Sequence, residues 1–394
     1  MRIAYIAPYK GPTLVEQRPV VRNLSLSNTI KIELIAQLLR SRSHEVDIIS
    51  SGEVVESHFR LYPAFYETQL FHPQISIHYA SALPIRFLNG FWSSTAMLRF
   101  FKRRHRTSPY DIIIIFNIRR FNIACANYAI RSLGLPVILQ YEDDLFVNVM
   151  GEPAGGFLTK SSHEAFTRLM SMVSGGMAVS PHLLSQLPPD IPKLLLRGVV
   201  GDDIVKTSRQ ANGAKKNWVL FSGTHIQSNG IGELIKAWGA TKIPDWELHV
   251  TGHGQMTDEL KQMAAKIQGI VFHGLVSREE LVNLLCSAKI CINPHAVSTT
   301  PGNVFAFKII EYLGAGAHVI TTPMGTLERE VESGITYMSD NSPGTIGATI
   351  QRVIQTRRWE HSVAEAIHSV YGSAAVADSL DTLLKRVAKE SFKA

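Results

Sequence analysis

Residues 111–116, DIIIIF, contain five consecutive apolar residues, the pattern of a strand that is buried on both faces. Strands of this kind belong mainly to parallel sheets that helices cover on both sides. Further apolar runs at 2–7, 137–141 and 218–222 alternate with stretches of helical periodicity. The pattern predicts repeated βα units and an α/β fold.

This alternation of strand and helix starts twice along the chain. The first series has predicted strands at 2–7, 46–49, 111–116, 137–141 and 175–179, and the second at 218–222, 247–251, 270–272, 289–293 and 318–321. We therefore expect two Rossmann-like domains whose parallel sheets face an interdomain cleft, with ligands beyond the carboxyl ends of the strands. The predicted bounds are a first domain at 1–200, a polar linker at 201–217, a second domain at 218–360 and a helical segment at 361–394, which could pack back on the first domain.

The length of 394 residues fits two domains at roughly 150 residues each. No apolar run approaches the ~18 residues of a membrane span, and Pro8 interrupts the N-terminal apolar run too early for a signal peptide. Cys125, Cys286 and Cys291 form no C-x-x-C pair. This indicates a reducing cytoplasm and argues against a cysteine zinc site.

The excess of positive over negative charge is confined to the first half of the chain. Residues 1–200 hold 21 Lys and Arg against 14 Asp and Glu, whereas the remainder holds 19 of each. Much of the excess lies in Arg99–Arg106, RFFKRRHR. Such a basic and aromatic cluster can contact an anionic membrane, a nucleic acid or an acidic substrate. A solvated helix end with ordinary positive charge explains it equally well.

Glycines follow two predicted strands of the second domain. Gly223 opens the turn SGTHIQSNGIG at 222–232, and Gly252 follows the strand 247–251. Free N–H groups in such a turn can hold an anion, and glycine lets a ligand approach the backbone closely. Ordinary βα turns are the alternative, because the G-x-G-x-x-G fingerprint and the Walker lysine are missing.

The segment 302–320, GNVFAFKIIEYLGAGAHVI, is the most informative for function. Pro301-Gly302 breaks the backbone before a short apolar helix, whose N-terminus suits a diphosphate. Lys308 could neutralise a diphosphate leaving group. Glu311, expected on the second to third turn near the same face, could accept hydrogen bonds from sugar hydroxyls.

Three acids follow a predicted strand of the first domain in QYEDD, at 140–144. Glu142 or Asp143 could act as a base toward an acceptor hydroxyl or position a sugar. Asp143 or Asp144 could instead cap the next helix. No companion cluster at ligand spacing accompanies them, so we predict no metal site.

Several of these segments resemble the GT-B glycosyltransferases, in particular family 4, the glycosyl transferases group 1. SHEV at 43–46 resembles the G-H-E-V of that family, while AVS at 178–180 and RGV at 197–199 resemble its A-V-S and N-G-V landmarks. The stretch 218–238 is similar to its F-x-G-R-x-x-x-x-K-G turn. Residues 303–320 are similar to its E-x7-E block with the strand that follows, and this is the most specific match.

The chain departs from the family at positions that would contact the donor. Thr224 and Asn229 stand where the family has Arg and Lys, and Asn303 stands where it has the first Glu of the pair. The second Glu is kept as Glu311. Lys308 resembles the lysine of bacterial polysaccharide glycosyltransferases that reaches the diphosphate, and we interpret it as replacing the charge lost at 224 and 229.

The resemblance implies a metal-independent hexosyltransferase, active in the cytoplasm or peripherally on the inner membrane face. Its donor substrate would be a nucleotide diphosphate sugar, without a cofactor, and its acceptor a hydroxyl of a glycan or lipid-linked molecule, as in bacterial polysaccharide or glycoconjugate synthesis. Glu142 and Asp143 fall where some inverting GT-B enzymes carry their base. The expected donor-binding residues are Gly223, Thr224, Asn229, Gly252, Gly302, Asn303, Lys308 and Glu311.

Three other functions stay open from the sequence. A nucleotide-sugar epimerase on the same fold would turn over donor without acceptor. A catalytically silent sugar-binding subunit would fit the weakened diphosphate site. A dinucleotide-dependent oxidoreductase fits least, because neither half carries the glycine fingerprint. We expect no nucleic-acid partner.

Overall fold

The computed structural model describes most of the chain. The described residues are 1–18, 26–52, 54, 59–68, 75–85, 88–142, 157–210, 215–241, 243–297, 306–323, 327, 329–357 and 363–391. Contacts divide the chain into two compact units. Unit 1 comprises Met1–Leu196 together with Val376–Ala394, and unit 2 comprises Arg197–Ala375.

Unit 1 is built on an eight-stranded sheet of order β3-β4-β2-β1-β5-β6-β7-β8. Its strands are β1 (Arg2–Ile6), β2 (Glu45–Ser50), β3 (Phe65–Thr68), β4 (Ile75–Tyr79), β5 (Ile112–Phe116), β6 (Val137–Tyr141), β7 (Gly175–Ala178) and β8 (Lys193–Leu195). Only the edge pair β3 and β4 is antiparallel among these neighbours. The predicted run DIIIIF forms the central strand β5, which is buried throughout.

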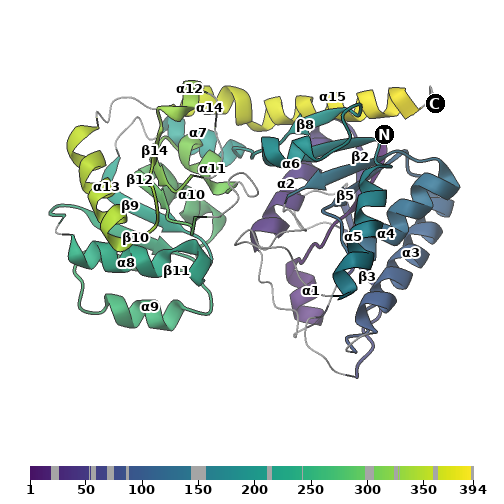
Figure 1. Ribbon diagram of the computed structural model, residues 1–394, viewed down its shortest axis with the longest axis horizontal. Helices are drawn as coiled ribbons and strands as arrows, with labels where there is room; N and C mark the ends of the chain where they lie inside the picture. The colour runs from purple at the N-terminus through teal and green to yellow at the C-terminus, as the bar shows by residue number, and fades with distance from the viewer. Residues whose placement is uncertain are drawn as a thin grey trace. The chain divides into compact units, whose positions relative to one another are not determined.

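Helices cover the unit 1 sheet on both sides, with α2 on one side and α3 and α4 on the other (Figure 1). The helices of this unit are α1 (Pro12–Gln17), α2 (Leu26–Ser41), α3 (Asn89–Thr107), α4 (Arg120–Tyr128), the π-helix η1 (Ala129–Leu133), α5 (Phe157–Met170), α6 (Pro181–Ser185) and α15 (Ser373–Ser391). Val387 of α15 lies against Gly175 of β7, where a β-carbon would come within 2.5 Å of it. The last strand of the unit is β8, which corrects the expectation that 175–179 ends the series.

Unit 2 is built on a parallel six-stranded sheet of order β11-β10-β9-β12-β13-β14. Its strands are β9 (Lys216–Ser222), β10 (Glu247–Thr251), β11 (Ile270–Gly274), β12 (Ala288–Asn293), β13 (His318–Thr321) and β14 (Ile335–Tyr337). The strand order reverses between β9 and β12, as in dinucleotide-binding Rossmann folds. A mainly parallel sheet in unit 1 and a parallel sheet in unit 2, each with helices alternating along the chain, confirm the predicted α/β fold class.

The helices of unit 2 follow its strands in regular alternation (Figure 1). They are α7 (Asp202–Gln210), the 3₁₀ helix η2 (Gln227–Asn229), α8 (Ile231–Ala240), α9 (Thr257–Ala264), α10 (Arg278–Ser287), α11 (Lys308–Gly314), α12 (Arg329–Glu332), α13 (Pro343–Thr356) and α14 (Ala364–Tyr371). Side chains of β9, β10, β12 and α8 form a fully buried core.

The predicted linker 201–217 differs from the structure. It contains α7, a helix of unit 2, and the first residues of β9. Ile204 is completely buried while the polar residues around it face outward, so the segment is an amphipathic helix despite its charge. The C-terminal residues Val376–Ala394 cluster with unit 1.

Candidate donor site in unit 2

The strand reversal in unit 2 places the candidate site. Ser222 ends β9 and Asn293 ends β12, and these two strands are neighbours at the reversal. The helices that follow them diverge to opposite faces of such a sheet, which leaves a crevice at the carboxyl ends. The predicted residues Gly223 and Gly252 lie at this edge, directly after β9 and β10.

Position 252 requires glycine because the backbones of the turns after β9 and β10 approach closely there. Its φ is +114°, and a β-carbon there would lie 1.9 Å from the carbonyl oxygen of Gly223. The Gly252 amide donates to the Gly274 carbonyl over 2.8 Å. Any side chain at 252 would therefore push the β9 and β10 turns apart.

Lys308 projects from α11 to the same edge. Its Nζ lies 3.3 Å from the Ser222 carbonyl oxygen, to which it donates, and 5.1 Å from the centre of the Phe221 ring. Burial lowers the pKa of Lys308 to about 8. No described carboxylate forms an ion pair with this ammonium group. The structure thus brings together Lys308, Gly223 and Gly252, which are distant in sequence.

Two residues that were not predicted as part of the site, Tyr312 and His295, lie near this lysine. The Tyr312 hydroxyl, one turn further along α11, donates to the same Ser222 carbonyl over 3.1 Å. His295 lies close enough that, besides burial, the charge of Lys308 lowers the His295 pKa. The position of Tyr312 four residues after Lys308 was a signal for a shared face. His295 comes near only through the folding of the sheet, so nothing local in the sequence marked it.

Thr224 and Asn229 shape the turn after β9. Asn229 Nδ2 donates to the Thr224 carbonyl over 2.7 Å, and Thr224 is exposed. The following Gly230 has φ +68°, and a β-carbon there would overlap the Pro294 carbonyl oxygen at 1.8 Å. Asn229 therefore closes its own turn in this structure.

Glu311 is the fourth residue of α11, in its first turn, because the helix begins only at Lys308. This corrects the expected position on the second to third turn. Its Oε1 accepts a hydrogen bond from Arg278 Nη1 at 2.8 Å, and Arg278 also pairs with Asp203. Neither Arg278 nor Asp203 was predicted, although Arg278 opens the helix that follows β11 at the same edge.

Glu142 follows β6 in unit 1, as predicted, and is held by several groups. Its carboxylate pairs with Lys31 and accepts from Gln140 Nε2 at 2.6 Å. Its backbone amide donates to Asn117 Oδ1 over 2.7 Å. The side chains of Glu142 and Lys31 are 10% and 7% exposed. This carboxylate is therefore rigid and its charge is matched within unit 1.

Asp143, Gly302 and Asn303 lie outside the described residues. The part of the chain that the structure describes holds no group of three or more His, Cys, Asp or Glu side chains suited to a metal ion. Within the same residues, no helix combines the length and the apolar character needed to cross a bilayer.

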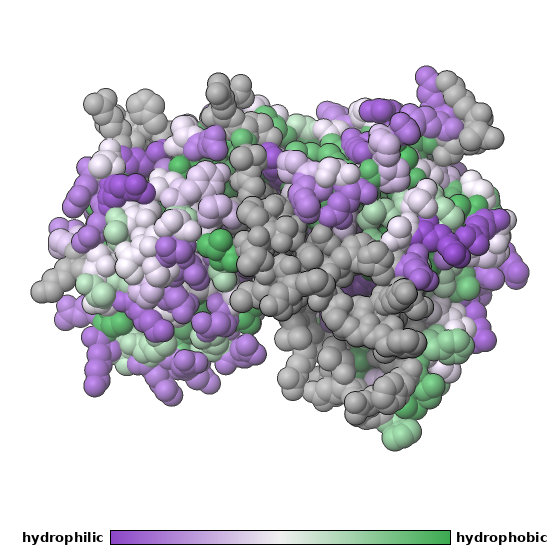
Figure 2. Space-filling model, viewed as in Figure 1, coloured by the Kyte–Doolittle hydropathy of each residue, from purple (hydrophilic) through white to green (hydrophobic). Residues whose placement is uncertain are grey.

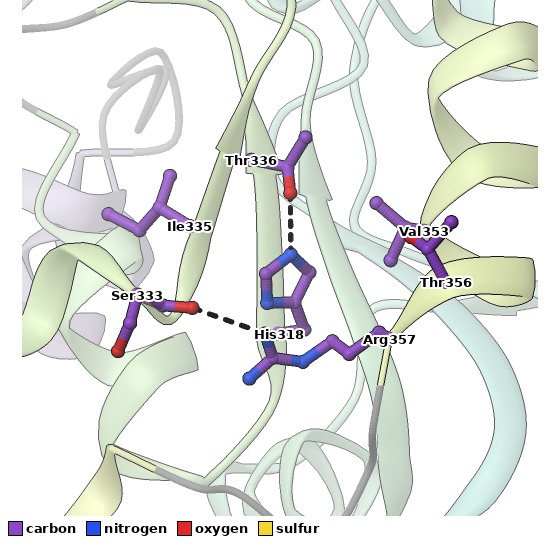
Figure 3. Close-up of a pocket in the computed structure, with 7 residues that line it drawn as sticks. All are labelled: His318, Ser333, Ile335, Thr336, Val353, Thr356 and Arg357. Atoms are coloured by element: carbon purple, nitrogen blue, oxygen red, sulfur yellow. Dashed lines mark hydrogen bonds between the residues drawn. The ribbon is translucent and has the colours of Figure 1, made fainter.

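A cavity of about 400 Å³ lies at the amino end of β13 and β14, away from the strand reversal (Figure 3). His318 Nε2 pairs with Thr336 Oγ1 at 2.8 Å, and Arg357 donates to the Ser333 carbonyl over 3.1 Å. Burial, with a smaller effect of the Arg357 charge, lowers the pKa of His318 to about 3. None of the predicted site residues lines this cavity.

The basic cluster Arg99–Arg106 forms the C-terminal end of α3. Arg99, Arg103 and Arg106 are exposed, whereas Lys102 lies over the Tyr128 ring and Arg104 contacts Asp47. Hydrophilic residues gather over α3 on the face drawn in Figure 2. The cluster thus divides into packed and solvent-facing residues.

Comparison with known proteins agrees with this architecture. Residues 216–356 match the family model described as glycosyl transferases group 1. No curated protein sequence matches the chain significantly.

Solved structures match almost the whole chain at low identity. Sucrose-phosphate synthase from Thermosynechococcus elongatus has a TM-score of 0.70 at 16% identity and covers 98% of this chain and 99% of its own. HepE from Anabaena in complex with UDP has a TM-score of 0.65 at 15% identity, and the match covers 98% of this chain and 100% of HepE. WaaG, a glycosyltransferase involved in lipopolysaccharide biosynthesis, has a TM-score of 0.56 at 14% identity, and the match covers 99% of this chain and 98% of WaaG. The chain therefore has the GT-B fold of glycosyltransferases, and its second unit carries the sequence signature of glycosyl transferases group 1.

Proposed function

We propose that the chain is a glycosyltransferase that moves a hexose from a nucleotide diphosphate sugar to a hydroxyl of a glycan or lipid-linked acceptor. The observation that carries this proposal is Lys308, a cation without a described carboxylate partner at the strand reversal of unit 2. A charged group whose burial lowers its pKa gains most from a ligand of opposite charge. HepE, a structural relative, was solved with UDP-glucose.

In this proposal unit 2 binds the donor. Lys308 stabilises the charge that develops on the leaving diphosphate, so that no metal ion is needed, while Gly223 and Gly252, which carry no side chain, let the diphosphate approach the backbone. Glu311 accepts hydrogen bonds from donor hydroxyls. Asn229 and Thr224 keep the β9 turn in the shape that admits the diphosphate.

Unit 1 supplies the acceptor side of the reaction. Glu142, with Asp143 beside it in sequence, takes the proton from the acceptor hydroxyl or orients the acceptor. The ion pair with Lys31 holds the Glu142 carboxylate in place. Glu142 Oε1 accepts a hydrogen bond from Gln140 Nε2. If this bond breaks, Oε1 becomes available to the acceptor.

A thermal-shift screen with UDP-, GDP-, ADP- and dTDP-glucose tests the donor assignment. We expect one nucleotide series to raise the melting temperature in a saturable manner. A flat response to all four sugars would reject the transferase function. For the donor that binds, NMR of the product's anomeric configuration then distinguishes retention from inversion.

We further propose that α3 contacts an anionic membrane surface peripherally. Arg99, Arg103 and Arg106 recur at i, i+4 and i+7, so they share one face of the helix. Phe91, at its beginning, is 75% exposed. Each basic residue near an anionic bilayer contributes about 1 kcal/mol.

Sedimentation with vesicles tests this contact. The protein should bind vesicles that contain phosphatidylglycerol and not pure phosphatidylcholine vesicles. The triple change of Arg99, Arg103 and Arg106 to Gln should abolish binding, while Lys206→Gln, Lys236→Gln and Lys261→Gln in unit 2 should not. Equal binding by both triple variants would leave α3 as an ordinary solvated helix end.

A further inference from the structure

Arg278 joins Asp203 and Glu311, which come from two other helices of unit 2. Arg278 is the first residue of α10, Asp203 lies in the first turn of α7, and Glu311 lies in the first turn of α11. Arg278 Nε and Nη2 donate to the two Asp203 oxygens at 2.7 and 3.2 Å. Its Nη1 donates to Glu311 Oε1 at 2.8 Å. One guanidinium group therefore fixes two carboxylates.

The backbone at Gly201 passes close to this group, whose Arg278 and Asp203 side chains are 39% and 44% exposed. At Gly201 a β-carbon would lie 2.4 Å from Asp203 Oδ1 and 3.3 Å from Arg278 Nη2. Asp203 Oδ1 also accepts from the Ile204 amide at 2.8 Å. A planar guanidinium held in this bidentate manner has a defined orientation, which a flexible lysine would not have.

Glu311 is incompletely satisfied by these contacts. Its side chain is only 16% exposed. While Oε1 is taken by Arg278, Oε2 accepts no hydrogen bond from the described residues. Burial raises the pKa of Glu311, and the Arg278 charge opposes this rise. Because the described residues leave Oε2 without a donor, water or a ligand hydroxyl can supply one.

We propose that Arg278, anchored by Asp203, is a positioning residue that sets the specificity of unit 2 for a donor with free hydroxyls. It holds the Glu311 carboxylate in one orientation, so that Oε2 accepts a hydrogen bond from the ribose or from the transferred sugar. This assignment rests on the proposed function of unit 2 as the donor-binding unit. The recognised group is a sugar hydroxyl, which belongs either to the ribose of the nucleotide or to the transferred sugar. Ligands that lack one or the other hydroxyl distinguish these two cases.

Isothermal titration of the full-length chain tests the proposal. The ligands are UDP, ADP and GDP, their 2′-deoxy counterparts, and the glucose conjugate of whichever base binds. The variants are Arg278→Met, Arg278→Lys, Asp203→Asn and Glu311→Gln. Arg209→Met is the matched control, because Arg209 forms an exposed pair with Glu365 elsewhere in unit 2.

We expect Arg278→Met to weaken the hydroxyl-bearing ligand about 10-fold or more, in line with the loss of one charge-assisted hydrogen bond. The same variant should change binding of the ligand that lacks the recognised hydroxyl less than 2-fold. Asp203→Asn and Arg278→Lys should give intermediate losses, and Arg209→Met none. A loss confined to the ribonucleotides identifies the ribose, and one seen only with the glucose conjugate identifies the sugar.

Two results would overturn the assignment without touching the proposed function. In one, wild-type protein binds nucleotide and Arg278→Met binds every ligand as well as wild type does. In the other, Arg278→Met weakens all ligands equally, which is the signature of a merely structural residue. If the wild-type chain binds none of the nucleotides or their sugars, the proposed function and this inference both fall.

Discussion

The two units treat a charged side chain at the carboxyl edge of their sheets in opposite ways. In unit 1, Glu142 has a cation, Lys31, against it and an amide donor on its other oxygen. In unit 2, Lys308 donates to a backbone carbonyl and has no described carboxylate as a partner. Glu142 is thus electrostatically complete without a ligand, whereas Lys308 is not.

This difference indicates which edge depends on a ligand for its charge balance. A pre-paired carboxylate is held in place and contributes geometry, since removing either partner leaves a buried charge. A cation whose pKa burial has lowered gains from any anion that arrives. We therefore expect variants at Lys31 to act on stability and variants at Lys308 to act on binding.

The largest effect should come from breaking the pair in unit 1. Lys31→Met leaves Glu142 buried without its cation, at a cost of about 4 kcal/mol in the free energy of unfolding. Hydrogen exchange of peptides from β6 and α2, read by mass spectrometry, reports this unit alone. The double variant Lys31→Met/Glu142→Leu should recover most of the loss. Unchanged exchange in the single variant would show that the pair is not the stabilising contact.

Gly252→Ala should destabilise unit 2 by about 3 kcal/mol. The substitution combines an unfavourable positive φ with overlap of the new methyl group and the Gly223 carbonyl. Gly344→Ala is the control, because Gly344 lies in helix α13 with no atom within 4 Å of its β-carbon position. That change should be neutral or stabilise by about 0.5 kcal/mol. Both are measured by thermal unfolding, and equal melting temperatures would contradict the close approach.

Lys308→Met should separate binding from stability. We expect the Kd for the nucleotide sugar to rise about 100-fold, because a charge-assisted contact to the diphosphate is lost. The free energy of unfolding should stay the same or rise, since a cation that burial disfavours is removed. Lys236→Met, at an exposed position of α8, should change neither quantity. A large loss of stability in Lys308→Met with normal affinity would reverse this assignment.

The smallest effect is a dependence of donor affinity on pH. With a pKa of about 8, Lys308 is charged at pH 7 and mostly neutral at pH 9. The Kd for the sugar conjugate should rise about 10-fold between these values. Because the folded-state pKa lies below the usual lysine value, stability should change in the other direction and rise above pH 8. Plots of log Kd against pH should differ in slope between wild type and Lys308→Met. Parallel plots would show that Lys308 is not the group responsible for the pH dependence.

The sequence predicted the architecture well where strands are continuous apolar runs. Strands β1, β5, β6, β9 and β10 lie within a residue or two of their predicted bounds. The strands β3, β4, β8 and β14 were missed. The residues of β3, β8 and β14 are only partly buried or polar, and in β4, ISIHY, a serine and a histidine interrupt the apolar run although most of the strand is buried. The helix α7 was taken for a linker, since one buried isoleucine in a polar stretch is a weak periodic signal.

The candidate site was predictable in part. Glycines after β9 and β10 and a lysine in the helix after β12 could be marked from their order along the chain. The pairing of Glu311 with Arg278 could not, because it depends on side chains from three helices that only the folded sheet brings together. For the same reason the Lys31 partner of Glu142, more than a hundred residues earlier, left no local signal.

Helix α15 has a consequence for how the chain is made. The segment Val376–Ala394 belongs to unit 1, although all of unit 2 precedes it in the sequence. Its Asp378 and Asp381 pair with Arg42 and His44, and Val387 covers β7. On the ribosome, unit 2 emerges as one continuous segment and can fold at once. Until α15 has been synthesised Val387 cannot cover β7, so unit 1 completes its packing only after all of unit 2 has been made.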